Sequence, residues 1–178
     1  FGSYESSPEQ ALETGVRFFK EAKPQAVKLE GGAKVIPQIK KLIAAGIPVM
    51  GHLGLTPQSV HALGGFKVQG RGDSGIEIKE DAKALEAAGV FALVLELVPA
   101  ELANEISKEL SIPVIGIGAG AGCDAQVLVW TDLVGLTKEP PKLAKVYRNL
   151  RGEISAAVGE WIDDVESGKF PEEGQTFH

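Results

Sequence analysis

A cation and an anion lie two positions apart in a short apolar stretch, "AVKLEGG", at residues 26–32. Because alternate side chains of a β-strand point to the same face, Lys28 and Glu30 are predicted to lie side by side. A lysine there could stabilise a developing oxyanion, and a carboxylate could support a magnesium ion or its water ligands. The spacing fits an ion pair at the rim of a sheet equally well, so both interpretations stay open.

Two further strand ends carry ionisable side chains. Glu96 is the single carboxylate within the apolar run "FALVLELVPA", and a buried carboxylate is costly unless it is paired or functional. We therefore predict that Glu96 acts as a general base, the alternative being a side chain that turns outward to solvent. His52 ends the strand-like run "IPVMGHL". The more common role of a lone histidine there is a hydrogen-bonded core residue, with a substrate contact as the alternative.

Two glycine-rich segments could contact anions. The loop at 63–75 carries Lys67 and Arg71, and it could form a mobile lid, an anion contact or simply a solvated loop. The segment "GIGAGAGCDAQ" follows an apolar strand, as phosphate-cradling loops do, but it lacks the Walker lysine and the dinucleotide fingerprint. Close approach of neighbouring strands explains its glycines better.

These side chains need a scaffold that brings strand ends together, and the chain repeats a helix-then-strand pattern. Four amphipathic helical segments each precede a strand rich in Val, Ile and Leu, which is typical of a parallel sheet. The strands are predicted at "QAVKLE", "IPVMGHL", "VFALVLEL" and "IPVIGIGAG", with a fifth at "DLVGL". After Pro140-Pro141 the pattern predicts one or two amphipathic helices over about 141–168.

Successive strand–helix units leave two architectures, the (β/α)8 barrel and the open doubly wound sheet. The doubly wound sheet usually carries a glycine-rich fingerprint in its first strand-to-helix turn, and none is found there. We therefore predict an α/β protein of the (β/α)8 TIM barrel class. Such a barrel takes about 250 residues. Residues 1–178 are accordingly predicted to hold about the last five βα units as the C-terminal part of a single domain.

Composition excludes several classes of protein. The net charge of -6 argues against a nucleic-acid-binding protein, which usually presents a basic face. No run of about 18 uncharged apolar residues occurs, so no membrane span is predicted. The single cysteine, Cys123, excludes an internal disulfide and fits a reducing compartment, so we predict a cytoplasmic protein.

Several longer motifs are together specific for one family. They are "FGSY", "VKLEGG", "GIPVMGHLGLTPQSVHALGGFKVQGR", "LVLELVP", "IPVIGIGAGAGCDAQVLV" and "ESGKFPEEGQTFH". Through them the chain resembles the ketopantoate hydroxymethyltransferase (3-methyl-2-oxobutanoate hydroxymethyltransferase) family over essentially its whole length. The resemblance implies a (β/α)8 barrel that assembles as a homo-oligomer, often a decamer.

The resemblance also implies a reaction and a site. The family transfers a hydroxymethyl unit from 5,10-methylenetetrahydrofolate to 3-methyl-2-oxobutanoate, giving 2-dehydropantoate for pantothenate (vitamin B5) synthesis, with Mg²⁺ as cofactor. By motif, Lys28 is similar to the ketoacid-binding lysine, and Glu30 is similar to a magnesium-site carboxylate that acts largely through water. Glu96 resembles the proton acceptor. His52 resembles a histidine near the site, whose role the motif does not define.

The chain departs from the family pattern at two places. Ala125 stands where the family motif has glycine, which is a mild change in a structural segment. In the family, an aspartate that ligates magnesium and an "Asp-Ser-Leu" motif precede "FGSY", and neither is present here. The resemblance therefore implies that three barrel strands are missing and that an N-terminal part or a companion chain carries them. This chain alone is then expected to be neither stable nor active.

Two other functions remain open on the sequence. One is a magnesium-dependent C–C lyase acting on 2-oxo acids, of the phosphoenolpyruvate/isocitrate lyase type. Such lyases carry a cysteine in a lid loop, and the loop at 63–75 has none. The other is a catalytically incomplete half-barrel that acts as an assembly module. The retained set of Lys28, Glu30 and Glu96 counts against it.

Overall fold

A computed structural model describes residues 1–178 of the protein. The chain divides into two compact units, residues 1–127 and residues 128–178, and each is described by itself. No boundary at this point was predicted from the sequence, because no linker-like segment marks it. No helix is long and apolar enough to cross a lipid bilayer.

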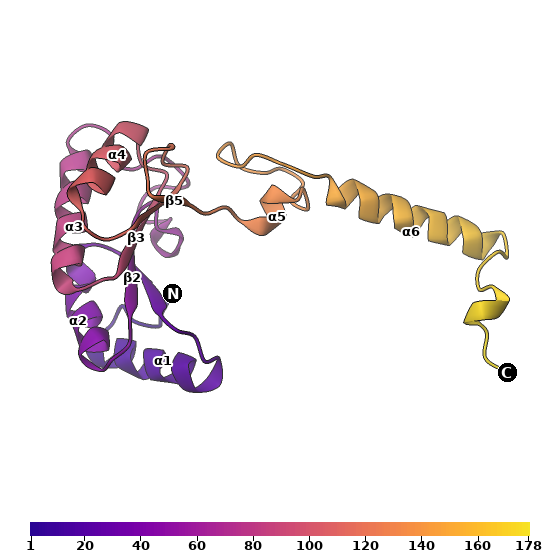
Figure 1. Cartoon of the computed structure of the whole chain (residues 1–178), viewed down its shortest axis with the longest axis horizontal. Helices are drawn as coiled ribbons and strands as arrows, with labels where there is room; N and C mark the ends of the chain where they lie inside the picture. Colours follow the sequence, from indigo (N-terminus) through magenta and orange to yellow (C-terminus); the bar gives the residue numbers. More distant parts are fainter. The chain divides into compact units, whose positions relative to one another are not determined.

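The first unit is built on a parallel sheet whose strands follow one another in chain order (Figure 1). The strands are β1 (Val27–Glu30), β2 (Val49–Gly54), β3 (Ala92–Glu96), β4 (Val114–Ile117) and β5 (Ala125–Gln126). Every neighbouring pair is parallel. Sequential order is the order of strands in a (β/α)8 barrel, whereas the strand order of a doubly wound sheet reverses at a switch point. The predicted barrel class is therefore confirmed.

Helices cover one face of this sheet, as Figure 1 shows. They are α1 (Pro8–Glu21), α2 (Ile36–Ala44), α3 (Ser74–Ala88) and α4 (Ala100–Glu109). The strand residues in the core with these helices are apolar and buried: Leu29, Val49, Leu53, Leu93, Leu95 and Val114. The alternate strand residues point to the opposite face, and these include Lys28, Glu30, His52 and Glu96. One face of the sheet therefore forms the core, and the other carries the candidate site residues.

Local sequence signals explain where these helices begin and end. Ser7 accepts a hydrogen bond from the N–H of Gln10 at 3.1 Å, which caps the start of α1. Gly89 ends α3 in the left-handed region, with a φ of 98°. Two short 3₁₀ turns, η1 (Ala33–Val35) and η2 (Pro57–Ser59), follow β1 and β2. Both turns come directly after a strand with a candidate site residue, so they shape the carboxyl edge of the sheet.

The fifth strand does not lie where the sequence predicted it, at "DLVGL". That segment contains the end of a short helix, α5 (Trp130–Leu133), and the turn after it, while strand β5 precedes it in the chain. Asp132 is buried and accepts a hydrogen bond from the Thr137 hydroxyl at 2.5 Å. Such local side-chain bonds compete with strand pairing, so the prediction from apolar composition alone was wrong here.

The second unit contains one long helix, α6 (Leu150–Glu166), and the short turn η3 (Glu173–Gln175). The helix begins at residue 150 rather than at about 141, where the sequence placed it. Asn149 caps this start, because its Oδ1 accepts a hydrogen bond from the N–H of Gly152 at 3.2 Å. The apolar residues of α6 recur at helical spacing and are exposed: Leu150, Ile154, Val158, Trp161, Ile162 and Val165. The helix thus presents an apolar stripe that its own unit leaves uncovered.

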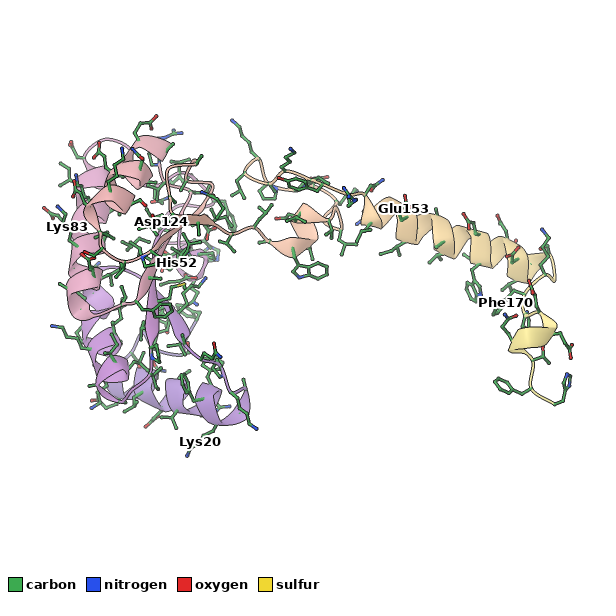
Figure 2. The ribbon with its side chains drawn as sticks, viewed as in Figure 1. Lys20, His52, Lys83, Asp124, Glu153 and Phe170 are labelled. Atoms are coloured by element: carbon green, nitrogen blue, oxygen red, sulfur yellow. The ribbon has the colours of Figure 1, made fainter.

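A contact between two aromatic rings joins α6 to the segment after it. Trp161 meets Phe170, labelled in Figure 2, edge to face with ring centroids 6.2 Å apart. This geometry is one of the favoured arrangements of aromatic pairs. It fixes the end of the helix against the turn that follows.

Tyr4 ties the N-terminal segment to the end of β1. Its buried hydroxyl donates a hydrogen bond to the carbonyl of Glu30 at 3.0 Å. Burial, together with the nearby carboxylates of Glu30 and Glu5, raises the pKa of Tyr4 to about 12. The folded chain therefore holds this proton more tightly than the unfolded chain, in which the pKa of a tyrosine is about 10.

This difference predicts an alkaline loss of stability that depends on Tyr4. The contribution of Tyr4 is fully present below about pH 10 and is lost as the pH rises through about 12. We expect the urea midpoint of the wild-type chain to fall more steeply across this interval than that of Tyr4→Phe. Equal slopes for the two proteins would contradict the expectation.

Candidate active site

Three neighbouring strands bring Glu30, His52 and Glu96 together at the carboxyl edge of the sheet. Glu30 pairs in register with His52, and Glu96 pairs with Gly54, further along β2. Nδ1 of His52 lies 3.5 Å from a carboxylate oxygen of Glu30, and its Nε2 lies 3.2 Å from one of Glu96. The imidazole, labelled in Figure 2, thus stands between two carboxylates from different strands.

This Glu30–His52–Glu96 row is largely withdrawn from solvent. The side chain of His52 is 2% exposed, and those of Glu30 and Glu96 are 9% and 18% exposed. Both ring nitrogens lie within ion-pair distance of a carboxylate, yet neither meets the geometry of a hydrogen bond, so both are buried without a hydrogen-bond partner. A buried ring whose polar atoms lack hydrogen-bond partners is available to bind a ligand. His52 is therefore not the fully hydrogen-bonded core residue that the sequence favoured for a lone histidine.

Backbone N–H groups orient Glu30, and such groups cannot be recognised from residue types in the sequence. Its Oε2 accepts a hydrogen bond from the N–H of Gln58, in η2, at 2.9 Å. The next N–H along the chain, from Gly31, donates to the carbonyl of His52 at 3.0 Å. Sequence reasoning missed Gln58, because any residue can supply a backbone N–H. It also missed the role of Tyr4, whose only signal was its place in the "FGSY" motif.

The backbone directly after Glu96 is strained. Leu97 has a φ of 47°, in the left-handed region that residues with a side chain rarely adopt. Two hydrogen bonds of 2.9 Å hold it there: its N–H donates to the carbonyl of Ile117, and its carbonyl accepts from the N–H of Gln69. Strain of this kind concentrates at functional sites. Together with the burial of the carboxylate, it favours a functional Glu96 over one that turns to solvent.

Gly54 stands in register beside Glu96, and adding one methyl group at this position is expected to destabilise the folded chain strongly. Its φ is 90°, and a Cβ there would overlap the Glu96 carbonyl and press on Val98. We expect Gly54→Ala to lower the free energy of unfolding by about 2–4 kcal/mol, because backbone strain and overpacking add. Gly46→Ala is the matched control, since Gly46 has a φ of 85° with open space around it. Equal losses of the two variants in urea unfolding would contradict the close-approach explanation.

Lys28 lies on the same face of the sheet, in register with Met50. Its side chain is exposed, and no carboxylate lies within ion-pair distance of it. The ion pair with Glu30 that the sequence left open is therefore not formed, because Glu30 turns to His52 instead. A cation without a partner at this edge can meet an anionic group of a substrate.

The side chains at this edge could supply part of a magnesium site but not a complete set of ligands. No group of three or more His, Cys, Asp or Glu side chains is arranged to hold a metal ion. One oxygen of Glu30 accepts the N–H of Gln58 and the other faces His52, so this carboxylate suits a contact through water. Mg²⁺ commonly keeps several waters and uses one or two carboxylates. Glu30 matches that role, without forming a protein cage.

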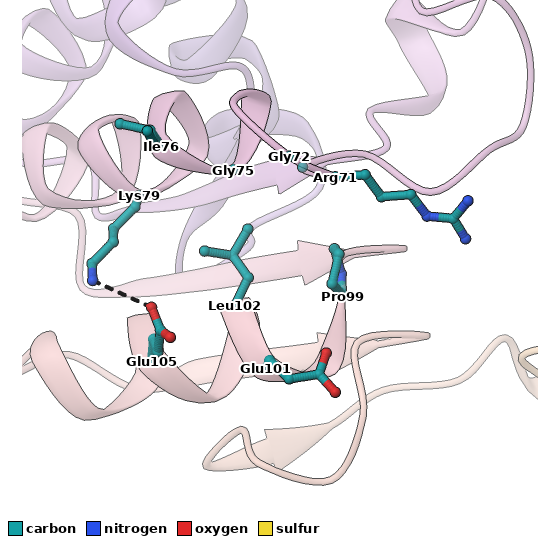
Figure 3. Close-up of a pocket in the computed structure, with 10 residues that line it drawn as sticks. Arg71, Gly72, Gly75, Ile76, Lys79, Pro99, Glu101, Leu102 and Glu105 are labelled. Atoms are coloured by element: carbon teal, nitrogen blue, oxygen red, sulfur yellow. Dashed lines mark hydrogen bonds and ion pairs between the residues drawn. The ribbon is translucent and has the colours of Figure 1, made fainter.

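The basic loop residue Arg71 lines a groove that is separate from the Glu30–His52–Glu96 row. It lines a groove of about 530 Å³ between the first turns of α3 and α4, with Lys79, Glu101, Leu102 and Glu105 (Figure 3). Lys79 pairs with Glu105 at 3.4 Å, and Figure 3 shows the Arg71 guanidinium pointing away from that pair. None of the residues of the Glu30–His52–Glu96 row lines this groove. Its walls carry both signs of charge, which does not favour an anion site.

The first glycine of "GIGAG", Gly116, has a packing explanation. A Cβ on Gly116 would come within 3.0 Å of the Cys123 sulfur and 3.1 Å of the Gln126 side chain. Burial and the neighbouring Asp124 carboxylate raise the pKa of the Cys123 thiol, which disfavours a nucleophilic thiolate. This segment therefore shows close packing and no sign of a catalytic cysteine.

The strand order, the helices on one face and the ionisable groups at the strand ends define an α/β barrel protein with its site at the carboxyl edge of the sheet. This edge is where barrel enzymes hold their active sites. The model of the ketopantoate hydroxymethyltransferase family matches residues 1–173. The chain belongs to this family, as its motifs indicated.

Curated relatives named 3-methyl-2-oxobutanoate hydroxymethyltransferase match nearly all of the chain. The protein of Acidothermus cellulolyticus is 56% identical over 99% of this chain and 66% of its own length. The protein of Frankia alni is 58% identical over 96% of this chain and 57% of its own length. The protein of Rhodococcus jostii is 53% identical over 99% of this chain and 62% of its own length. The chain thus spans less than two thirds of the length of these relatives. A solved structure of an enolase from Gibberella zeae matches 64% of this chain and 24% of the enolase chain, at 22% sequence identity. Its TM-score of 0.43 is too low to support a conclusion about the fold or function of this chain.

Proposed function

We propose that this chain carries the proton-abstracting part of a 3-methyl-2-oxobutanoate hydroxymethyltransferase. In this reaction a hydroxymethyl unit passes from 5,10-methylenetetrahydrofolate to 3-methyl-2-oxobutanoate, and 2-dehydropantoate forms on the route to pantothenate. The observation that carries the proposal is the row in which His52 lies 3.5 Å from Glu30 and 3.2 Å from Glu96. The name shared by the relatives supports the same reaction.

Glu96 serves as the base. The reaction must remove a proton from C3, beside the ketone, and so form an enolate. Glu96 ends an apolar strand and is largely shielded, so water competes little with the substrate for its carboxylate. His52 contacts this carboxylate and keeps it oriented. The methylene carbon of the folate then exchanges its two C–N bonds for a bond to the enolate carbon and a bond to a hydroxyl group from water. The proton removed from C3 and the remaining proton of that water pass to the two nitrogens, so that tetrahydrofolate leaves.

Lys28 and Glu30 serve the oxygen end of the substrate. The unpaired ammonium of Lys28 offers positive charge to the oxyanion that grows on the ketone oxygen. Glu30 would hold Mg²⁺, largely through water. Mg²⁺, when bound, supplies a Lewis acid that lowers the cost of the enolate. The two side chains of one strand thus have different tasks, and an ion pair between them would hinder both.

Proton exchange at C3 of 3-methyl-2-oxobutanoate tests the proposal, followed by NMR in deuterated water with Mg²⁺. We expect exchange without folate and product only when 5,10-methylenetetrahydrofolate is added. The chain is assayed by itself and joined to the part of the A. cellulolyticus relative that it does not cover, and the form that exchanges is used for all variants. Absence of exchange in both forms overturns the proposal. Exchange in the joined form alone means that residues from elsewhere complete the site.

The same assay separates the two other functions. A magnesium-dependent C–C lyase would split a 2-oxo acid with no folate present, and no feature of the site favours it. A half-barrel that serves only assembly would neither exchange nor split the ketoacid. The largely shielded Glu30–His52–Glu96 row counts against such a passive role, because removing carboxylates from water is costly.

We further propose that the working protein is a cytoplasmic homo-oligomer. Ile154 and Trp161, in the apolar stripe of α6, are 55% and 53% exposed, which supports association with another protein surface. The single cysteine, Cys123, is free, as is usual in a reducing compartment. Native mass measurement tests the assembly: Ile154→Glu is expected to lower the mass, and a monomeric wild-type protein would contradict the proposal.

A further inference from the structure

Two adjacent glycines separate Glu30 from the helical run η1–α2, and this turn has little backbone restraint of its own. Gly31 has a φ of 120°, a conformation that residues with a side chain rarely adopt. Gly32 occupies the N-cap position of η1 and has no side chain with which to cap it. The first N–H groups of the run therefore need an acceptor from elsewhere in the chain.

Asp81, on α3, supplies that acceptor. Its Oδ1 accepts a hydrogen bond from the N–H of Ala33 at 2.8 Å. A Cβ on Gly32 would overlap the Asp81 carboxylate, so a glycine at this position permits the approach. A negative charge at the start of a helical run also interacts favourably with the helix dipole. Asp81 is thus an N-cap provided by a neighbouring helix, and it explains why the second glycine is needed.

We propose that Asp81 is a positioning residue for Glu30, an inference that rests on the proposed function. The Glu30 carboxylate accepts the N–H of Gln58, and the following Gly31 is bonded to the carbonyl of His52. The bond from Ala33 to Asp81 anchors the far side of the two glycines. Without that anchor, the glycines allow the end of β1 to change direction. The Glu30 carboxylate then no longer keeps its place beside His52.

Glu86 offers a matched control on the same helix. Its carboxylate accepts a hydrogen bond from the N–H of Ser111 at 2.6 Å. The bond is of the same kind as that of Asp81, but it is made to the loop that precedes β4. Loss of this bond therefore weakens the contacts of α3 in a comparable way, without touching the turn after Glu30.

The test compares Asp81→Ala, Asp81→Asn and Glu86→Ala in the chain joined to the part of the A. cellulolyticus relative that it does not cover. The measurements are amide hydrogen exchange and ¹³C NMR of the Glu30 carboxyl group. We expect Asp81→Ala to speed exchange of the Ala33 amide by about tenfold, the usual effect of losing an N-cap, and to shift the Glu30 resonance. Asp81→Asn retains an oxygen acceptor and is expected to behave as wild type, as is Glu86→Ala at both probes. The proposal is overturned if Asp81→Ala leaves either the exchange rate of the Ala33 amide or the chemical shift of the Glu30 carboxyl carbon unchanged. It is also overturned if Glu86→Ala changes both quantities as Asp81→Ala does.

Gly32 gives a second measurement of the same contact. Gly32→Ala displaces the Asp81 carboxylate, so it should reproduce Asp81→Ala and add little to it in the double variant. Fully additive effects would overturn the assigned contact.

In the form that exchanges the ketoacid proton, Asp81→Ala should raise the half-saturating Mg²⁺ concentration by about tenfold, with a smaller effect on the maximal rate. If the wild type shows no C3 exchange, the proposed function fails, while the amide and resonance measurements still decide the role of Asp81.

Discussion

Glu96→Gln is expected to abolish proton exchange at C3 of 3-methyl-2-oxobutanoate while leaving ketoacid binding largely intact. Glutamine keeps the length and shape of the side chain but cannot take up the proton. The rate should therefore fall by about 10²–10⁴-fold, the usual contribution of a general base. Exchange is followed by NMR, and binding is measured by titrating the ketoacid in the presence of Mg²⁺.

The control for this variant is Glu101→Gln, an exposed carboxylate in the first turn of α4. It removes the same charge from the chain and is expected to leave the exchange rate close to that of the wild type. If the Glu96→Gln protein exchanges at the wild-type rate, Glu96 is not the base. Loss of ketoacid binding in that variant would instead indicate that the carboxylate has a binding role.

His52→Gln is expected to slow the same exchange by about a hundredfold, the cost of misplacing a catalytic group by about 1 Å. The ring is buried between two carboxylate oxygens, at 3.5 Å and 3.2 Å. Without it, Glu30 and Glu96 lose the group that separates and orients them, and their like charges repel. The expected loss lies in the maximal exchange rate more than in the ketoacid concentration needed for half-saturation.

His61→Gln is the matched control, because His61 is the exposed histidine of the neighbouring loop. Urea unfolding of both variants separates a disturbed site from a disturbed fold. Wild-type exchange by a folded His52→Gln protein would show that the Glu30–His52–Glu96 row is a structural feature. A slow His61→Gln protein would point to a general effect of removing a histidine.

Local patterns were sufficient for most of the fold. Apolar runs rich in Val, Ile and Leu located β1 to β4, since this signal depends on neighbouring residues only. The same reasoning was wrong at "DLVGL", where the buried Asp132 bonds to Thr137 and turns the chain. It also began the last helix too early, because the prediction followed the apolar spacing and did not use the N-cap signal at Asn149.

The candidate site divides in the same way. Alternation along a strand was enough to put Lys28 and Glu30 on one face, and an apolar surrounding was enough to single out Glu96. Their partners could not be read from spacing. Whether Glu30 meets Lys28 or His52 depends on the register between β1 and β2, and that register follows from the packing of the whole sheet.

The two glycines of "AVKLEGG" show the physical reason most clearly. Glycine tolerates the positive φ that Gly31 adopts after β1, and this tolerance is a property of the residue itself. Their purpose became visible only in the folded chain, where Asp81 of α3 reaches the N–H of Ala33 across Gly32. Backbone conformation is largely a local property, whereas a contact between residues far apart in the chain exists only once the elements between them have packed.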